Sequence, residues 1–182
     1  MAGAGAGHPA LNETSLFVGV DIGTSGCRAI AIDRDGAPAA TAKAPLPAPV
    51  RAGPASLQDP DLWWQGALDA LGALLAELTP GRIRAIAVDG TSGTLLLAAP
   101  DGTPLTTGRM YDDAAAVAQA RLIARHAPPD SPVSTATSSL AKLLLMASTS
   151  AEGKALYAEW IVDACRSFSA LGALLYGLFT AA

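Results

Sequence analysis

The chain has 182 residues, of which 51% are hydrophobic, 15% charged and 5% aromatic, and its formal net charge is −4. This length suits one α/β domain with a hydrophobic core, and the apolar content excludes a disordered protein. The 12 basic residues form no cluster, which argues against nucleic-acid binding. Cys27 and Cys165 lie far apart and predict neither a disulfide framework nor a zinc site, so we expect a reducing compartment.

Residues 1–15 are rich in Gly and Ala and carry neither the basic n-region nor the apolar h-region of a secretory signal. We interpret them as a flexible leader. They also lack arginine, so a cytoplasmic protein is expected, with a plastid as the open alternative. The longest apolar run, residues 170–182, is shorter than the roughly 20 residues that span a bilayer, so no membrane partner is expected.

Three short strands are predicted after the leader. Residues 16–22 are almost wholly apolar, and apolar residues dominate again over 27–33 and 37–43. Residues 34–36 read Arg-Asp-Gly, and the glycine suits the positive φ of a hairpin turn. Strands this close together in sequence predict an antiparallel meander.

A loop and a long helix follow. Residues 44–60 hold five prolines and are predicted to be a loop. Asp59 and Pro60 are expected to be the N-cap and the first residue of a helix that ends at 79–81. The apolar face predicted for this helix consists of Trp63, Ala67, Leu71, Leu74, Leu75 and Leu78, and it is widened by Trp64 and Leu68.

The remaining elements predict a mixed α/β fold. A strand over 83–88 is expected to lie parallel to the first strand, because a crossover helix connects the two. A strand over 94–98 and an Asp-Gly turn at 101–102 come next. Helical patterns then cover 114–126, 140–147 and 155–164, and Lys142 is expected to extend its ammonium group to solvent.

The first strand ends in a motif whose residues suit phosphate and metal binding. A carboxylate at the end of a central strand is partly desolvated and needs a counter-charge such as a metal ion. Glycines let the backbone approach an anion, hydroxyls donate to it, and arginine offers a bidentate fork. The motif contains Asp21, Gly23, Thr24, Ser25, Gly26 and Arg28. An ordinary tight turn capped by Asp21 is the alternative.

A second polar loop follows the strand over 83–88 directly. It contains Asp89, Gly90, Thr91 and Ser92. Ligands of open α/β sheets bind at the carboxyl ends of the strands, and a carboxylate with several hydroxyls suits a polyol. A plain β-turn is the alternative.

The stretch LFVGVDIGTSGCRAIAID resembles the first phosphate motif of the FGGY family of carbohydrate kinases. The resemblance continues through the helix start DPDLWW, through IRAIAVDGTSGTLLLAAPDGTPL, and through MYDD and SSLAKLLLM, over roughly residues 16–147. It implies an α/β lobe with the actin-like ATPase (ribonuclease H-like) fold. In that lobe a three-strand meander and a parallel crossover strand form one mixed sheet with flanking helices.

By this resemblance the reaction is transfer of the γ-phosphoryl group of ATP to a hydroxyl of a ketopentose, ribulose or xylulose. The implied Mg²⁺ ligand is Asp21, and the implied phosphate-binding residues are Gly23, Thr24, Ser25 and Arg28. The implied sugar-binding residues are Asp89, Gly90, Thr91, Ser92, Tyr111 and Asp113. Asp113 suits equally the N-cap of the helix over 114–126.

The chain also departs from the family pattern. The family's general base is an aspartate in the middle of a considerably longer chain, before a second domain that binds adenine, and neither has a counterpart here. We therefore expect a truncated sequence with a leader (1–15), a kinase N-terminal domain (16–164) and a divergent apolar tail (165–182). Little or no turnover is expected from the chain alone.

Two alternatives stay open. The chain could be a non-catalytic sugar- or nucleotide-binding or dimerising fragment that associates with a full-length kinase and regulates it. It could also be another ATPase or kinase with the actin-like fold, since several such enzymes share a first hairpin of this kind.

Overall fold

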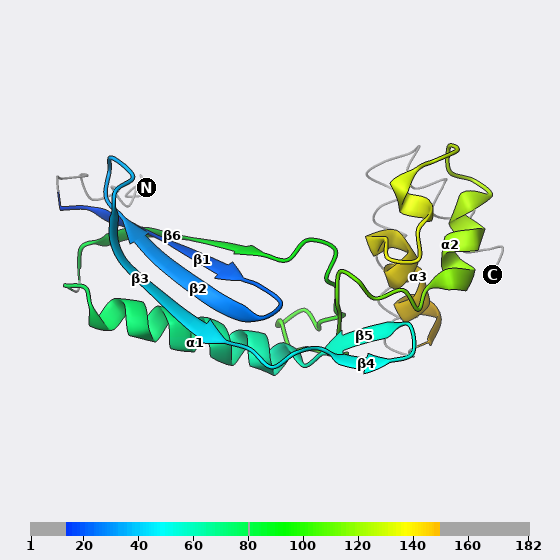
Figure 1. Ribbon diagram of the computed structural model, residues 1–182, viewed down its shortest axis with the longest axis horizontal. Coiled ribbons are helices and arrows are strands. Elements are labelled where there is room, and N and C mark those ends of the chain that lie inside the picture. Colours follow the sequence, from blue (N-terminus) through cyan, green and yellow to red (C-terminus); the bar gives the residue numbers. More distant parts are fainter. Residues whose placement is uncertain (1–13, 80, 150–182) are drawn as a thin grey trace, which may run out of the picture. The chain divides into compact units, whose positions relative to one another are not determined.

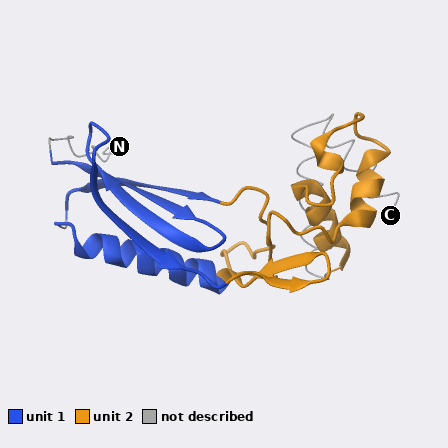
Figure 2. Cartoon of the chain, in the orientation of Figure 1, with its two compact units in different colours: residues 1–47, 61–90 blue, residues 48–60, 91–182 orange. Residues whose placement is uncertain are grey.

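The computed structural model describes residues 14–79 and 81–149 of the chain. Their contacts divide into two compact units (Figure 2). Unit 1 contains residues up to 47 together with 61–90, and unit 2 contains 48–60 together with the residues from 91 onward. The expected helix over 155–164, the tail and most of the leader lie outside the described residues.

Unit 1 is built on a four-stranded mixed sheet (Figure 1). Its strands are β1 (Leu16–Ile22), β2 (Gly26–Ile32), β3 (Pro38–Pro45) and β6 (Ile83–Gly90), in the spatial order β3-β2-β1-β6. β2 pairs antiparallel with both β1 and β3, and β6 pairs parallel with β1. The predicted meander and the predicted parallel crossover are therefore confirmed.

One face of this sheet is covered by α1 (Pro60–Ala76), which begins at the predicted proline (Figure 1). The core between them contains Val18, Val20, Cys27, Ala29, Ala31, Ala40, Ala44, Ala70 and Leu74. Because β-strand side chains alternate between faces, these strand residues share the face toward the helix. The other face of the sheet carries the residues of the phosphate motif.

The buried face of α1 agrees with the predicted one in part. Leu74 is buried, and Ala67, Leu71 and Leu78 pack against the core, as predicted, whereas Leu75 and Trp64 are exposed. Gly66 and Ala70 are buried as well, and the prediction did not include them. A Cβ atom on Gly66 would lie 2.6 Å from Leu46 Cδ2 and 3.2 Å from Cys27 Sγ, so the helix approaches the sheet through its smallest residue. Hydrophobic periodicity favours large residues and therefore missed this contact.

Unit 2 contains a second, small sheet that the sequence did not predict. Its strands are β4 (Val50–Ala52), β5 (Ala55–Gln58) and β7 (Gly108–Arg109), in the order β4-β5-β7 with antiparallel pairing. The interpretation of 44–60 as loop alone is therefore wrong. The predicted strand over 94–98 is also wrong, because only the isolated bridges Leu95–Arg109 and Ala98–Pro104 form there.

The helices of unit 2 are α2 (Val117–Ala124), the short 3-10 helix η1 (Pro132–Ser134) and α3 (Ser139–Thr149). α2 and α3 share a core of Ala116, Ala120, Ile123, Ala141 and Leu144. α3 confirms the predicted helix over 140–147, and α2 is shorter than predicted. No helix within residues 14–79 and 81–149 is long and apolar enough to cross a membrane.

Candidate functional site

Asp21 and Arg28 face each other across the first hairpin of unit 1. They are partners in the antiparallel pairing of β1 with β2, and Arg28 Nη1 lies 2.9 Å from Asp21 Oδ2. Both side chains are about half exposed on the sheet face opposite α1. The motif therefore presents a carboxylate and a guanidinium to solvent, and the two neutralise each other.

The turn between these residues depends on two glycines. The N–H of Gly23 donates to the carbonyl oxygen of Gly26 at 3.1 Å. A Cβ atom on Gly23 would lie 3.0 Å from that oxygen and 3.1 Å from Arg28 Nη1, and one on Gly26 would lie 2.8 Å from the Ala44 carbonyl oxygen. The space beside the guanidinium is thus one that any side chain at position 23 would fill.

Thr24 and Ser25 form the tip of the same turn. Ser25 is exposed and its carbonyl oxygen accepts a hydrogen bond from Leu46 N at 3.0 Å, while Thr24 is half-buried. The structure therefore brings all six residues of the predicted phosphate motif together in one hairpin.

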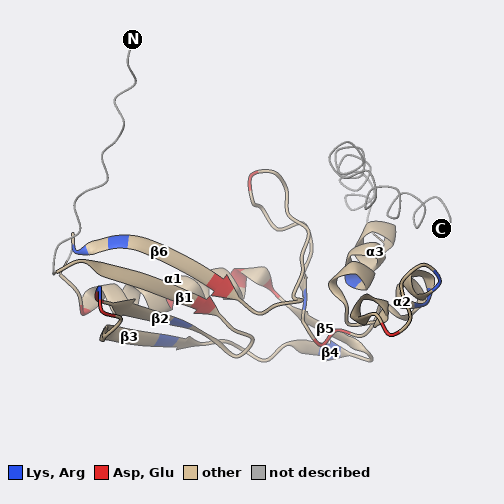
Figure 3. Cartoon of the chain, turned by 90° about the horizontal axis from the view of Figure 1, so that it is seen from above, with Lys and Arg blue, Asp and Glu red and all other residues tan. Residues whose placement is uncertain are grey.

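Asp89 lies beside Asp21 on the neighbouring strand. The two are partners in the parallel pairing of β1 with β6, so their side chains leave the sheet on the same face. Asp89 Oδ1 accepts a hydrogen bond from Gly90 N at 2.8 Å. Figure 3 shows acidic positions, in red, at the carboxyl-terminal ends of β1 and β6.

A cavity of about 450 Å³ opens on this face of unit 1. Gly19, Ile30 and Ala87 are among its apolar lining residues, and Asp21, Arg28 and Asp89 are the charged residues of the motifs that line it. Gly19 keeps the space open, because a Cβ atom there would lie 3.4 Å from Ile30 Cγ2. The cavity thus joins an apolar floor to the predicted phosphate and sugar motifs.

The residues of this cavity fit a phosphate-bound magnesium ion. Within residues 14–79 and 81–149 no three side chains of metal-ligating type gather into a site. Mg²⁺ commonly uses only one or two carboxylates, with waters and substrate phosphates as its other ligands. Asp21 and Asp89 supply two carboxylates, and the space at Gly23 lets a phosphate approach the backbone and Arg28.

Cys27 follows the turn and takes no part in this chemistry. Its side chain is fully buried against α1. Burial raises the pKa of the Cys27 thiol, the charge of Asp21 raises it further, and Arg28 opposes them. A thiol with a raised pKa is a poor nucleophile, so Cys27 acts as a small core residue.

The other predicted sugar residues belong to unit 2. Thr91 is half-buried and Ser92 is exposed, and Gly93 closes their turn with a φ of +72°. A Cβ atom on Gly93 would lie 3.9 Å from Cα and Cβ of Tyr111, whose residue is 51% exposed. The structure thus brings the Thr91–Gly93 turn against Tyr111.

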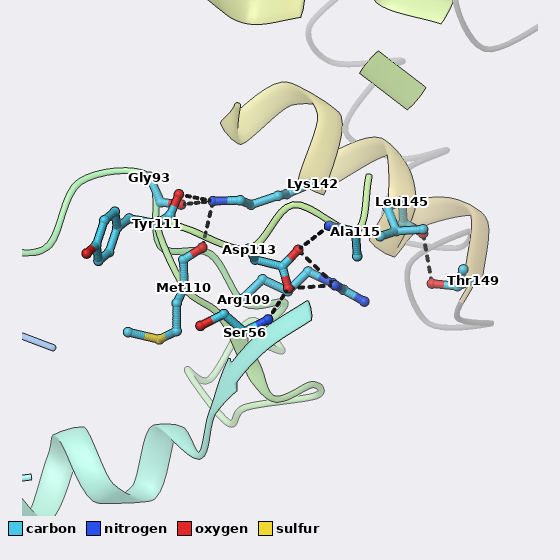
Figure 4. Close-up of polar contacts among 10 residues, drawn as sticks. All are labelled: Ser56, Gly93, Arg109, Met110, Tyr111, Asp113, Ala115, Lys142, Leu145 and Thr149. Atoms are coloured by element: carbon cyan, nitrogen blue, oxygen red, sulfur yellow. Dashed lines mark hydrogen bonds and ion pairs between the residues drawn. The ribbon is translucent and has the colours of Figure 1, made fainter. Parts of the chain in front are cut away.

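Asp113 is fully buried, and its carboxylate is surrounded by donors (Figure 4). Oδ2 accepts from Ser56 N at 2.9 Å and Oδ1 from Ala115 N at 3.2 Å. Arg109 Nη1 lies 3.1 and 3.2 Å from the two oxygens. Asp113 is not the N-cap of α2, as the sequence had suggested, because that helix begins at Val117 with Ala116 as its N-cap.

Sequence reasoning missed the contacts of Lys142. Its exposed fraction is zero, so the expectation that it reaches solvent is wrong. Nζ donates to the carbonyl oxygens of Gly93 and Met110 at 2.7 Å each and of Tyr111 at 3.0 Å (Figure 4). Burial lowers the pKa of Lys142, although the charges of Asp113 and Asp112 oppose this. A lone lysine on an apolar helix gave no signal for such a site.

Solved structures share this fold. The chain is similar to xylulose kinases from Brucella ovis, with 23% identity and a TM-score of 0.67, and from Rhodospirillum rubrum, with 20% identity and a TM-score of 0.66. These matches cover 77% and 76% of this chain and 30% of each kinase. A glycerol kinase from Plasmodium falciparum, solved with ADP, matches at 12% identity and a TM-score of 0.65 over 82% of this chain and 31% of its own.

The fold seen in these kinases is the actin-like ATPase fold, as the resemblance in sequence had implied. The chain spans about a third of the length of the solved kinases it matches. Residues 16–141 match the family model described as the FGGY family of carbohydrate kinases, N-terminal domain. That match covers more than half of the sequence, and the chain therefore belongs to the FGGY family of carbohydrate kinases.

Proposed function

We propose that this chain is the sugar-binding and phosphate-binding portion of an ATP-dependent kinase that phosphorylates a ketopentose, ribulose or xylulose. The observation that carries the proposal is the pairing of Asp21 with Asp89 beside the glycine-lined turn and Arg28. The similarity in fold to two solved xylulose kinases supports the substrate class.

In this proposal the charged groups of unit 1 hold the phosphates of ATP. Asp21 would hold Mg²⁺ through water, and the ion would neutralise charge on the phosphates. Arg28, which forms a 2.9 Å ion pair with Asp21 in the structure, would bind a phosphate with its guanidinium fork when the metal serves as the counter-charge of Asp21. Gly23, Thr24 and Ser25 place backbone and hydroxyl groups around the same anion.

Sugar-binding residues are proposed for each unit separately. In unit 1 they are Asp89 and Gly90, at the end of β6. In unit 2 they are Thr91, Ser92 and Tyr111, which offer hydroxyl and aromatic groups suited to a polyol. Asp113 is proposed to bind the sugar on one condition. Its roughly four lone-pair sites are filled by Ser56 N, Ala115 N and Arg109, so Arg109 must move before a sugar hydroxyl can bind.

For the 182 residues tested by themselves we propose little or no turnover, because they span only 30% of the length of the solved xylulose kinases that they match. The test is ADP release by the purified chain with Mg-ATP and ribulose, xylulose or glycerol in separate reactions. Binding of each sugar is measured beside it by titration calorimetry. We expect ketopentose binding without sugar-dependent ADP release. Sugar-dependent release that Asp21→Ala abolishes would show a base that we have not identified, and absence of binding to every sugar would refute the proposed function.

A second candidate is a regulatory fragment that dimerises or associates with a full-length kinase. The observation that favours it is on β6, where Ile86 is 53% and Val88 67% exposed although both are large and apolar. A clean monomer in gel filtration, with no co-elution with a full-length FGGY kinase, would exclude this candidate. The alternative of another ATPase or kinase with the actin-like fold is not proposed, because the chain belongs to the FGGY family.

The cellular setting follows from the same proposal. A ketopentose kinase works on small metabolites, so we propose a cytoplasmic protein, with a plastid as the alternative compartment. Neither nucleic acid nor membrane is proposed as a partner.

A further inference from the structure

Lys142 is a buried cation that the proposed phosphoryl transfer does not use. It lies on α3, within a helix that is otherwise apolar from Leu140 to Ala147, and its exposed fraction is zero. Burying an ammonium group is costly unless every donor is satisfied. A lysine here therefore has to be explained by what its ammonium group contacts.

The ammonium group is fully satisfied by main-chain oxygens. A lysine has three donors and no acceptor, and Nζ has three acceptors at 2.7, 2.7 and 3.0 Å. These are the carbonyl oxygens of Gly93, Met110 and Tyr111, which lie 49, 32 and 31 residues from Lys142 in the sequence. We call this arrangement the lysine clamp. It joins the Thr91–Gly93 turn and the Met110–Tyr111 segment to α3.

Both clamped segments carry side chains that the proposed function assigns to the sugar. Gly93 comes directly after Thr91 and Ser92. Tyr111, whose carbonyl oxygen accepts a hydrogen bond in the clamp, is half exposed. Hydrogen bonds from a charged donor are stronger than those between neutral groups. Because the main chain is held at both segments, the directions of these side chains depend on the clamp.

We propose that Lys142 is a positioning residue for sugar binding, which holds the Thr91–Gly93 turn and Tyr111 in the geometry that the sugar contacts. This inference rests on the proposed function. It assigns Lys142 no contact with the sugar or with ATP.

The test compares Lys142→Met with Leu144→Ala in the full chain. Methionine has a similar length and no donor, so it leaves three carbonyl oxygens without their partner. Leu144 is a buried neighbour on the same helix, and its truncation destabilises the α2–α3 core without touching the clamp. Ser148→Ala, which removes an exposed side-chain bond to the Leu145 carbonyl at 2.9 Å, is the mild control.

Two readouts are taken at a temperature where urea titrations show every variant to be folded. The first is ketopentose affinity by calorimetry. The second is hydrogen exchange at the amides of Thr94, Met110 and Asp113, whose hydrogen bonds close the clamped segments at 3.4, 2.9 and 3.0 Å. We expect Lys142→Met to weaken sugar binding about tenfold and to accelerate exchange at these amides. Leu144→Ala and Ser148→Ala are expected to leave the ketopentose affinity and the exchange rates of these amides close to the parent values.

Unchanged affinity and unchanged exchange in Lys142→Met would overturn the proposal, and so would equal losses in Leu144→Ala. If the parent chain binds no sugar, the proposed function fails, and unaltered exchange in Lys142→Met would still refute the clamp on its own. If Lys142→Met does not fold, the same two readouts, ketopentose affinity and hydrogen exchange, are taken on Lys142→Gln, which keeps two donors. Failure of both to fold would make Lys142 a folding residue and would overturn its positioning role.

Discussion

Asp21 and Asp89 are direct partners across the parallel pairing of β1 with β6, so two carboxylates stand side by side on one face of unit 1. Adjacent parallel strands lie about 4.8 Å apart, and like charges at that spacing repel unless a cation lies between or beside them. Arg28 is the cation paired with Asp21, at 2.9 Å, and Lys43 lines the same cavity. A divalent metal ion beside the two carboxylates would supply more positive charge than this one guanidinium does.

Replacing Asp21 should therefore weaken nucleotide binding in a magnesium-dependent way. We expect Asp21→Asn to reduce the affinity for Mg-ADP about tenfold, or about 1.4 kcal/mol, and to alter the affinity for metal-free ADP far less. Titration calorimetry with and without Mg²⁺ measures both. Asp69→Asn on the exposed face of α1, where Asp69 accepts from Gln65 Nε2 at 2.8 Å, is the matched control. Equal losses with and without Mg²⁺ would contradict a metal-holding role.

Gly23→Ala tests the space beside Arg28. The added Cβ atom would lie 3.0 Å from the Gly26 carbonyl oxygen and 3.1 Å from Arg28 Nη1, and the hairpin backbone has little freedom to yield. We expect a loss of about 1–3 kcal/mol in the free energy of unfolding and a larger relative loss of ADP binding. Urea titration and calorimetry separate the two effects. An alanine variant that binds ADP as the parent does would show that no phosphate enters this space.

Two glycines of α1 should respond to alanine in opposite directions. At Gly66 the new Cβ atom would lie 2.6 Å from Leu46 Cδ2 and 3.2 Å from Cys27 Sγ, so Gly66→Ala is expected to destabilise unit 1 by about 1–3 kcal/mol. At Gly72 nothing lies within 4 Å, and alanine is the better helix former, so Gly72→Ala is expected to stabilise by roughly 0.5–1 kcal/mol. Urea titration of both variants measures this, and destabilisation by Gly72→Ala would contradict the exposed face assigned to the helix.

The parts of the fold that could be predicted from sequence are those with a local signal. The strands of unit 1 follow from apolar runs and an Asp-Gly turn, and α1 follows from its proline start and periodicity. The β4–β5 hairpin was missed because its strands are short, one is wholly exposed, and prolines surround it. Gly66 was missed on the buried face of α1, because a glycine packs closely without adding hydrophobicity to the pattern.

The candidate site also has parts with a local signal in the sequence and parts without one. That Asp21, Gly23 and Arg28 lie together could be predicted, because they belong to one turn in the sequence. The clamp of Lys142 had no such signal, since its acceptors are backbone carbonyls 31–49 residues away and any residue type supplies a carbonyl. The contacts of Asp113 could not be predicted either, because Ser56 N, which donates to its carboxylate, lies 57 residues earlier in the sequence.

Asp112 should make unit 2 sensitive to acid. Burial raises the pKa of Asp112, whereas the neighbouring Ser56 hydroxyl and the Arg51 guanidinium lower it. Arg51 forms an ion pair with Asp112. The net pKa of Asp112 lies below the ordinary aspartate value of 3.8. A folded-state pKa below the unfolded one gives a stability contribution that is complete well above pH 3.8 and is lost as the pH falls through the folded-state pKa.

The variant Asp112→Asn removes this contribution. We expect it to unfold more easily than the parent at pH 7 by a modest amount, because the Arg51 side chain is 59% exposed and solvent screens the pair. The difference should shrink as the pH is lowered below about 4 and should also shrink in high salt. Thermal unfolding of parent and variant at matched pH values measures it. Asp130→Asn, elsewhere in unit 2, controls for the loss of one negative charge, and a difference that grows toward acid pH would contradict the assigned direction of the pKa shift.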